Sequence, residues 1–150
     1  MAGKHLCIKL HIVWSTKERR SLIDPLWRHR LHAYIGSLAR FNNARLIEAN
    51  SRPEHIHMYT AIPSTISIAD LVNALKANST RWVRQTFADQ RGFSWQEGYA
   101  AFSVSQSLEK VVIEYIRHQD DHHKRRDFRE ELLDLLARHG IEYDPRYIFD

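Results

Sequence analysis

The feature of this sequence that most limits its fold is the order in which its hydrophobic period changes along the chain. Residues 5–14 (HLCIKLHIVW) alternate apolar and polar side chains, which is typical of a strand with one buried face. From Asp24 to Phe41 the apolar spacing becomes helical, with Asp24 as the expected N-cap and Pro25 at the first helical position. The chain is therefore predicted to begin with a strand followed by a helix.

The same changes of period recur in the middle of the chain. Residues 44–50 and 54–62 have the composition of two strands, and the short SRP segment between them indicates a hairpin. A second helix is predicted from Ser67 to Phe87. After a segment rich in glycine and polar residues, residues 99–105 (YAAFSVS) are predicted to form a short fourth strand.

Two further helices are predicted at the C-terminal end. One covers 107–123 and opens with a serine cap, and the other covers roughly 127–139 and ends at Gly140, a suitable left-handed cap. The order β-α-β-β-α-β followed by two helices predicts an α+β fold of the ferredoxin-like, split βαβ type. Its antiparallel sheet would carry two helices on one face, and the additional C-terminal helices would follow in the sequence.

Length and composition indicate one globular domain over residues 1–150, since no low-complexity linker divides the chain. A single cysteine, Cys7, excludes an internal disulfide and a cysteine-based zinc site. No apolar run approaches the roughly 18 residues of a membrane span, and the N-terminus lacks a signal-peptide pattern, so we expect a cytoplasmic protein without a membrane partner. The formal net charge of +4 suits a nucleic-acid partner but is common in unrelated proteins.

Two histidines stand one residue apart in the predicted strand 54–62. Because a strand alternates its faces, His55 and His57 share one face with Tyr59. The two covering helices need the apolar face, so we expect the histidine pair on the face that they leave open. Two ordinary strand histidines are an equally good interpretation, because ten histidines give on the order of one such pair by chance. A metal ion at this pair would need a third ligand from elsewhere.

The predicted helix 107–123 offers candidates for that ligand. Tyr115, His118, Gln119 and His122 follow one another at helical spacing and form one stripe. A solvated helix face is the commoner meaning of such a stripe. The alternative is a reactive edge, because a tyrosine can act as a covalent nucleophile and an amide oxygen can join two imidazoles around a divalent ion.

Several segments, in the same order, resemble the HUH single-tyrosine transposases of the insertion-sequence 200/605 type and their domesticated relatives. The resemblance covers nearly the whole chain, and its one mild departure is Ala77–Asn78 after Lys76, where relatives often have a glycine. The segments that carry it are HIVWSTKERR (11–20), PEHIHMY (53–59), SIADLVNALKANSTRWVRQTF (67–87), FSWQEGYAAFSVS (93–105), VIEYIRHQDDHH (112–123) and HGIEYDPRYIFD (139–150).

The resemblance implies an enzyme that cuts and joins DNA strands with a metal ion. His55, His57 and Gln119 match the ligands of a divalent cation, Mg²⁺ or Mn²⁺, and Tyr115 matches the nucleophile. Attack by the tyrosine on a DNA phosphate would form a 5′-phosphotyrosine bond and free a 3′-hydroxyl, so that strands are transferred rather than hydrolysed. His118 and His122 match no firm role in the family.

The resemblance also implies the partners. The substrate would be single-stranded DNA with a hairpin at the ends of a mobile element, and the protein would be a homodimer with shared active sites. Basic residues after the first strand and on the second helix are predicted to bind phosphates, with Trp82 as a base-stacking group. An ordinary basic surface with Trp82 in the core is the alternative. These basic residues are Lys17, Arg19, Arg20, Lys76, Arg81 and Arg84.

Three other functions fit parts of this pattern. A domesticated protein that binds DNA hairpins without moving DNA would keep the same residues. A replication-initiating HUH nuclease would share the chemistry. A non-catalytic RNA-binding module of ferredoxin-like fold would depend neither on a metal ion nor on Tyr115, although the aromatic, glycine-rich strand typical of such modules is missing.

Overall fold

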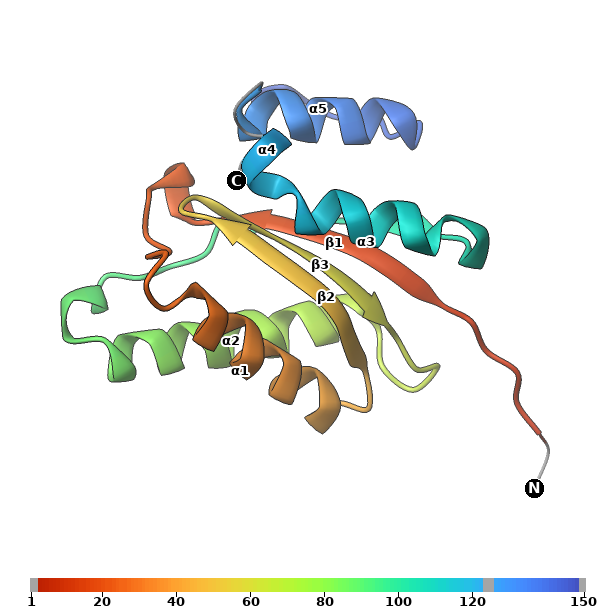
Figure 1. The fold of residues 1–150 in the computed structure, drawn as a ribbon, viewed down its shortest axis with the longest axis horizontal. Helices are drawn as coiled ribbons and strands as arrows, with labels where there is room; N and C mark the ends of the chain where they lie inside the picture. Colours follow the sequence, from red (N-terminus) through yellow and green to blue (C-terminus); the bar gives the residue numbers. More distant parts are fainter. Residues whose placement is uncertain (1–2, 123–125, 149–150) are drawn as a thin grey trace.

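The computed structural model describes residues 3–122 and 126–148, and it confirms the predicted fold class. In this part of the chain, four strands form one antiparallel sheet in the order β2-β3-β1-β4 (Figure 1). The strands are β1 (Lys9–Ser15), β2 (Arg45–Arg52), β3 (His55–Ala61) and β4 (Ala100–Val104). β1 and β3 are therefore the central strands, as expected for a split βαβ arrangement.

Two helices, α1 (Arg28–Phe41) and α2 (Ile68–Thr86), cover one face of the sheet (Figure 1). The main hydrophobic core lies between these helices and the sheet. Its fully buried members alternate along the strands and recur at helical spacing on the helices, as the sequence pattern requires. They include Ile12, Trp14, Ile56 and Met58 from the sheet and Leu31, Ile35, Leu71 and Leu75 from the helices.

The predicted starts of β1 and of α1 differ from those in the structure. β1 begins at Lys9 rather than at His5. The helix predicted from Asp24 begins at Arg28, because Asp24 forms a turn of its own: its carboxylate accepts a hydrogen bond from the Leu26 N–H at 2.8 Å. The predicted start of α2 is confirmed, since the Ser67 hydroxyl accepts a hydrogen bond from the Asp70 N–H at 3.0 Å.

The helix predicted over 107–123 is broken into two pieces. The two pieces, α3 (Glu109–Arg117) and α4 (Gln119–His122), meet at His118. The prediction of a serine cap is wrong, because the N-cap residue of α3 is Leu108, whose side chain makes no capping hydrogen bond. Residues 123–125 lie outside the described residues, so the predicted end of this helix at residue 123 does too.

The last helix, α5 (Phe128–Arg138), has clear signals at both ends. The Asp127 carboxylate caps its N-terminus by accepting a hydrogen bond from the Glu130 N–H at 2.9 Å. Gly140, after its C-terminus, has a φ of +65°, which confirms the predicted left-handed cap. In the described residues, no helix is long and apolar enough to cross a membrane.

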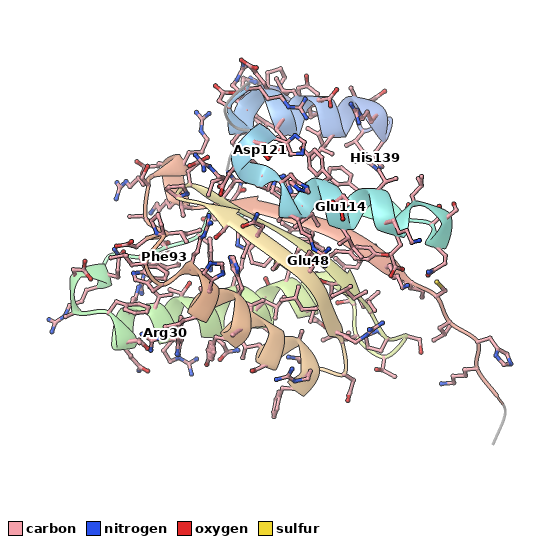
Figure 2. The ribbon with its side chains drawn as sticks, viewed as in Figure 1. Arg30, Glu48, Phe93, Glu114, Asp121 and His139 are labelled. Carbon is pink, nitrogen blue, oxygen red and sulfur yellow. The ribbon has the colours of Figure 1, made fainter. Side chains whose placement is uncertain are left out.

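The histidine pair lies on the sheet face that α1 and α2 do not cover, as predicted, but that face is not open, because α3, α4 and α5 cover it (Figure 1). Side chains fill the space between the sheet and this second layer (Figure 2). A smaller apolar cluster joins α5 to β1 and β4; its members are Val13, Phe102, Phe128, Leu132, Leu135 and Leu136. His55 and His57 therefore lie in the interior, each with none of its surface exposed.

Candidate active site

The histidine pair meets a carboxylate that comes from α5. His55 and His57 point from β3 toward the C-terminal helices, and Glu131 reaches them from the opposite side. Nε2 of His57 lies 2.8 Å from Oε1 of Glu131, and Nε2 of His55 lies 3.4 Å from the same oxygen. All three side chains are fully buried, so a charge placed here would not be screened by water.

The other ring nitrogen of each histidine also has a partner. Nδ1 of His55 donates to the Glu54 carboxylate at 3.0 Å, and Nδ1 of His57 lies 2.8 Å from Nε2 of His11. Burial alone would lower the pKa of His55, but the Glu131 and Glu54 carboxylates outweigh burial and the pKa is raised. Burial, followed by the neighbouring His57, holds the pKa of His11 well below its ordinary value, so His11 is neutral at pH 7.

His55, His57 and Glu131 are suited to hold a metal ion. Each offers one ligand atom, and these atoms lie within 4.8 Å of one another. Adjacent ligands around an octahedral Mg²⁺, each at about 2.1 Å, are roughly 3 Å apart, so the nitrogen-to-oxygen distances of 2.8 and 3.4 Å are of the required size. Two imidazoles and a carboxylate also suit Mn²⁺.

Sequence reasoning missed Glu131, although a signal was present. Along α5 the buried stripe consists of Phe128, Leu132, Leu135 and Leu136, and Glu131 is the one charged residue among the buried positions of that helix. A carboxylate on the apolar face of an amphipathic helix needs a partner when it is buried. Here its partners are His57 and Tyr115.

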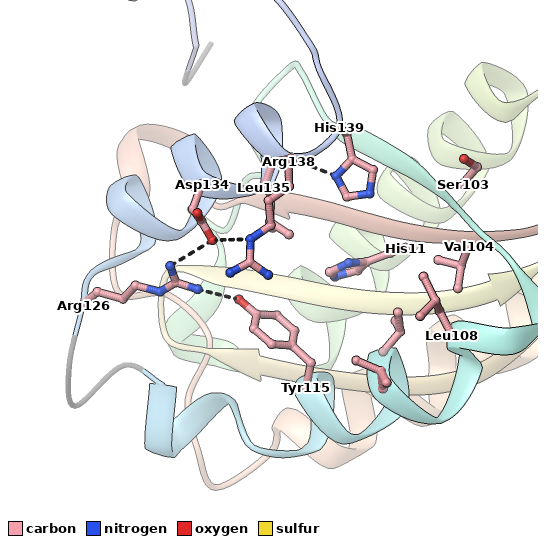
Figure 3. Close-up of a pocket in the computed structure, with 12 residues that line it drawn as sticks. His11, Ser103, Val104, Leu108, Tyr115, Arg126, Asp134, Leu135, Arg138 and His139 are labelled. Atoms are coloured by element: carbon pink, nitrogen blue, oxygen red, sulfur yellow. Dashed lines mark hydrogen bonds and ion pairs between the residues drawn. The ribbon is translucent and has the colours of Figure 1, made fainter.

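Tyr115 lies on α3 with its hydroxyl group directed into this site. The hydroxyl donates a hydrogen bond to Oε2 of Glu131. It also receives one from Nη2 of Arg126 at 3.4 Å (Figure 3). The ring stacks on His122 with a centroid distance of 4.5 Å. Burial, together with the negative charge of Glu131, raises the pKa of Tyr115 above its ordinary value, so the phenol is protonated in this arrangement.

Of the other residues in the predicted stripe, one lies buried in the site and one is exposed to solvent. Gln119 is fully buried, and its amide nitrogen donates to the Tyr115 carbonyl oxygen at 3.3 Å. His118, at the break between α3 and α4, is exposed and bonds the Glu114 carbonyl oxygen at 2.8 Å. Tyr115 thus contacts Gln119 and His122 across the break, while the role of Gln119 as a metal ligand stays a prediction.

A cavity of about 260 Å³ opens beside Tyr115, between α3 and α5 (Figure 3). His11 lies at its inner wall. Arg126 and Arg138 also line it, and both pair with Asp134, at 3.2 and 3.0 Å. The cavity therefore leads from positive charge at the surface toward the proposed nucleophile.

The loop after β1 brings the first group of predicted DNA-binding residues toward the histidine pair. Lys17–Arg19 form a 3₁₀ turn, in which Glu18 and Arg19 have φ angles of 58° and 55°, a strained region for residues other than glycine. This turn lines a cavity of about 610 Å³ with the segment 94–97. It also lines a second hollow together with Glu54 and Phe128, the neighbours of His55.

The basic residues predicted on α2 lie on the other side of the sheet and are partly engaged within the protein. The Lys76 ammonium donates to three backbone carbonyls of residues 96–98, at 2.8, 3.1 and 2.6 Å, and burial lowers its pKa to about 8. Arg84 donates to the Phe93 carbonyl oxygen at 2.8 Å. Trp82 stacks on Tyr34 at 4.8 Å, and Arg81 is exposed. Lys76 and Arg84 therefore hold the 93–98 loop, and contacts of α2 with DNA stay a prediction.

The fold and the site define a class of protein: a ferredoxin-like sheet on which a histidine pair, a carboxylate and a helix-borne tyrosine share one buried site. The model of a known family, described as "Transposase IS200 like", matches residues 5–119. The chain belongs to this family of IS200-like transposases.

Individual relatives agree with this assignment. The chain is 31% identical over 117 residues to the transposase for insertion sequence element IS200 of Salmonella typhimurium, covering 74% of this chain and 76% of that protein. It is 24% identical over 119 residues to the ISDra2 transposase TnpA of Deinococcus radiodurans, covering 76% of this chain and 85% of the relative.

Two solved structures share the fold. A putative transposase from Deinococcus radiodurans R1 superposes with a TM-score of 0.62 at 23% identity, covering 79% of this chain and 97% of that one. A REP-associated tyrosine transposase bound to a REP hairpin superposes with a TM-score of 0.60 at 15% identity, covering 82% and 74%.

Proposed function

We propose that this chain cuts and rejoins single-stranded DNA at hairpin-bearing ends of a mobile element, with Tyr115 as the nucleophile. The observation that carries the proposal is that the Tyr115 hydroxyl and the His57 ring contact the same buried carboxylate, that of Glu131. Membership of a transposase family favours this function over a non-catalytic RNA-binding module.

A divalent cation, Mg²⁺ or Mn²⁺, would be held by His55, His57 and Glu131. Gln119 is a further ligand on the strength of the family resemblance, and its burial one helical turn from Tyr115 supports that role. When bound, the cation would neutralise charge on a DNA phosphate and so ease attack at phosphorus.

The chain's own residues account for the movement of atoms. The Tyr115 oxygen attacks phosphorus, the bond to the 3′-oxygen breaks, and the phosphate remains linked to tyrosine at its 5′ side. The phenol proton passes to the Glu131 carboxylate, which already accepts its hydrogen bond, and the leaving 3′-oxygen takes a proton from water. A 3′-hydroxyl of another strand can then attack the phosphotyrosine and release Tyr115, so strands are rejoined without an external energy source.

The DNA would approach across positive surface on both sides of the site. Lys17 and Arg19 line the cavity with residues 94–97, and Arg19 also lines the hollow with Glu54 and Phe128. Arg126 and Arg138 line the cavity beside Tyr115. These side chains would bind phosphates on either side of a strand that passes through the site. A hairpin-bearing substrate follows from the family resemblance, and the REP-associated relative is bound to a REP hairpin.

We further propose a homodimer in which each Tyr115 serves the partner subunit. In one chain Tyr115 reaches its own histidine pair, and an exchange of α3 to α5 between two copies would preserve every one of these contacts. Leu108, just before α3, and Val111, on α3, are 53% and 63% exposed, which leaves apolar surface beside Tyr115 for a second copy to bury.

The test of the proposed function is a search for a covalent protein–DNA adduct. The chain would be incubated with Mn²⁺ and labelled single-stranded element ends, and the products separated under denaturing conditions. We expect an adduct with the single strand and much less with a perfect duplex, whose regular backbone does not bend into the buried site. Equal cutting of the two substrates would contradict the substrate assignment, and failure of every element end to form an adduct would contradict the function.

A further inference from the structure

We propose that His11 is a positioning residue that allows the proton of His57 to change ring nitrogens, and so makes Nε2 of His57 available to a cation. The inference rests on the proposed function, because it concerns a ligand of the proposed metal site. Nothing in the family comparison or in the sequence pattern assigns a role to His11.

The geometry places His11 directly behind His57. His11 lies on β1 and His57 on the neighbouring strand β3, with Nε2 of His11 2.8 Å from Nδ1 of His57 and the ring centroids 5.0 Å apart. The exposed fractions are 4% for His11 and 0% for His57, so water does not compete for this hydrogen bond. A hydrogen bond between two imidazole nitrogens contains one proton, so the tautomer of one ring determines the tautomer of the other.

Two arrangements of protons satisfy this pair. With Nε2 of His57 donating to Glu131, as the 2.8 Å distance indicates, Nδ1 of His57 accepts and Nε2 of His11 donates. When Nε2 of His57 gives its lone pair to a cation, Nδ1 must carry the proton and donate to Nε2 of His11. In the second arrangement the remaining proton of His11 is on its Nδ1, so the two rings together hold two protons in both cases.

An imidazole at position 11 fits both arrangements, whereas the usual partners of a metal-binding histidine fit only one. A carboxylate or a backbone carbonyl can only accept, so it would fix the proton on Nδ1 at all times. His55 has such a partner, because its Nδ1 lies 3.0 Å from the Glu54 carboxylate. His57 is therefore the ligand whose proton can move, and His11 lines the cavity beside Tyr115, through which protons can exchange with water.

The first measurement needs no substitution. Nitrogen–proton correlation spectra of the histidine rings would be recorded for the full chain without added metal and with saturating Mg²⁺. We expect the proton of His57 on Nδ1 when Mg²⁺ is present, and a matching change of tautomer at His11. The exposed His29, on the opposite helical layer, should be unchanged. A His57 that keeps its proton on Nε2 in the presence of bound Mg²⁺ would overturn the inference.

The second measurement compares His11→Leu with His11→Gln by direct titration of Mn²⁺ binding, with His29→Leu as control. Loss of the ring partner should weaken Mn²⁺ binding about 10- to 100-fold in His11→Leu. The amide of His11→Gln can turn to donate or accept and should bind nearly as the parent does. If the parent chain binds no Mn²⁺, the proposed function fails and this inference with it. If the parent binds and His11→Leu binds equally well, only the inference fails. Should His11→Leu not fold, the spectra of the parent chain decide.

Discussion

The ring of Tyr115 lies 5.9 Å, centroid to centroid, from the ring of His57, so the proposed nucleophile and a proposed metal ligand already share one site within a single chain. Glu131 joins them, because one of its oxygens accepts from the tyrosine and the other faces the histidine. Substitutions at these positions therefore test nucleophilic attack and metal binding separately.

Tyr115→Phe should abolish the covalent DNA adduct while hairpin binding changes by no more than a few-fold. The variant loses the attacking oxygen but keeps the ring that stacks on His122. Denaturing gels measure the adduct and a gel-shift titration measures binding. Tyr143→Phe, at an exposed position beyond α5, is the matched control and should behave like the parent chain. An undiminished adduct in Tyr115→Phe would remove the nucleophile assignment.

His57→Ala should eliminate both cleavage and tight Mn²⁺ binding. The substitution leaves fewer protein ligands for a hard cation that is already reluctant to lose its water shell. Cleavage assays with excess EDTA and with Mn²⁺ added back test the same point in the unaltered chain. Cleavage that continues in excess EDTA is the result that this model cannot accommodate.

Glu131→Gln should weaken Mn²⁺ binding by about tenfold or more, because the amide keeps the size of the side chain and removes its charge. Glu130→Gln, the exposed neighbour on the same helix, makes the same chemical change outside the site and should have no effect. Isothermal titration of both variants gives the comparison. Equal affinities would show that Glu131 is not a ligand.

A mixture of Tyr115→Phe and His57→Ala subunits should regain activity although each variant alone is inactive. If sites are shared, a heterodimer contains one site with both groups intact and one with neither. Adduct formation in the mixture, after subunit exchange has been verified by mass spectrometry, measures this. A mixture that stays inactive would mean that each Tyr115 serves its own subunit.

Acidification should destabilise the fold in part through His32. Burial, followed by the neighbouring His29 and Arg28, lowers the pKa of His32 to about 4. An unfolded histidine titrates near 6.5, so the unfolded chain binds more protons between these values and stability falls as the pH falls. At pH 5 this group costs at most about 2 kcal/mol.

Urea unfolding at pH 7.5 and pH 5 measures that effect. The glutamine of His32→Gln can keep the hydrogen bond to Ser51, which His32 makes at 2.8 Å, but it does not titrate. The variant should therefore lose less stability than the parent chain between the two pH values. Equal losses would show that His32 does not contribute.

The sheet and its two covering helices were predictable because their hydrophobic period is local information. Alternation along β3 placed His55 and His57 on one face, and the Ser67 cap marked the start of α2 correctly. The start of α1 was not predictable in the same way, since an aspartate can cap a turn as readily as a helix, and Asp24 caps a turn.

The part of the site that α3, α4 and α5 contribute could not be predicted in this way, because the positions of its residues depend on tertiary contacts. The break at His118 separates Tyr115 from α4 within a stretch whose period is helical throughout. Glu131 belongs to a helix distant in sequence, and only the folded chain shows that its carboxylate lies between His57 and Tyr115. The same holds for Lys76, whose ammonium is engaged with three carbonyls of the 96–98 loop.

The match to the family model ends at residue 119, whereas Glu131 lies on α5, beyond that match. The candidate site therefore joins three residues inside the matched segment, His55, His57 and Tyr115, to one residue outside it. Because the Glu131 carboxylate accepts the hydrogen bond of the Tyr115 hydroxyl, substitutions in α5 can change how firmly the tyrosine is held without altering the strand that carries the histidines.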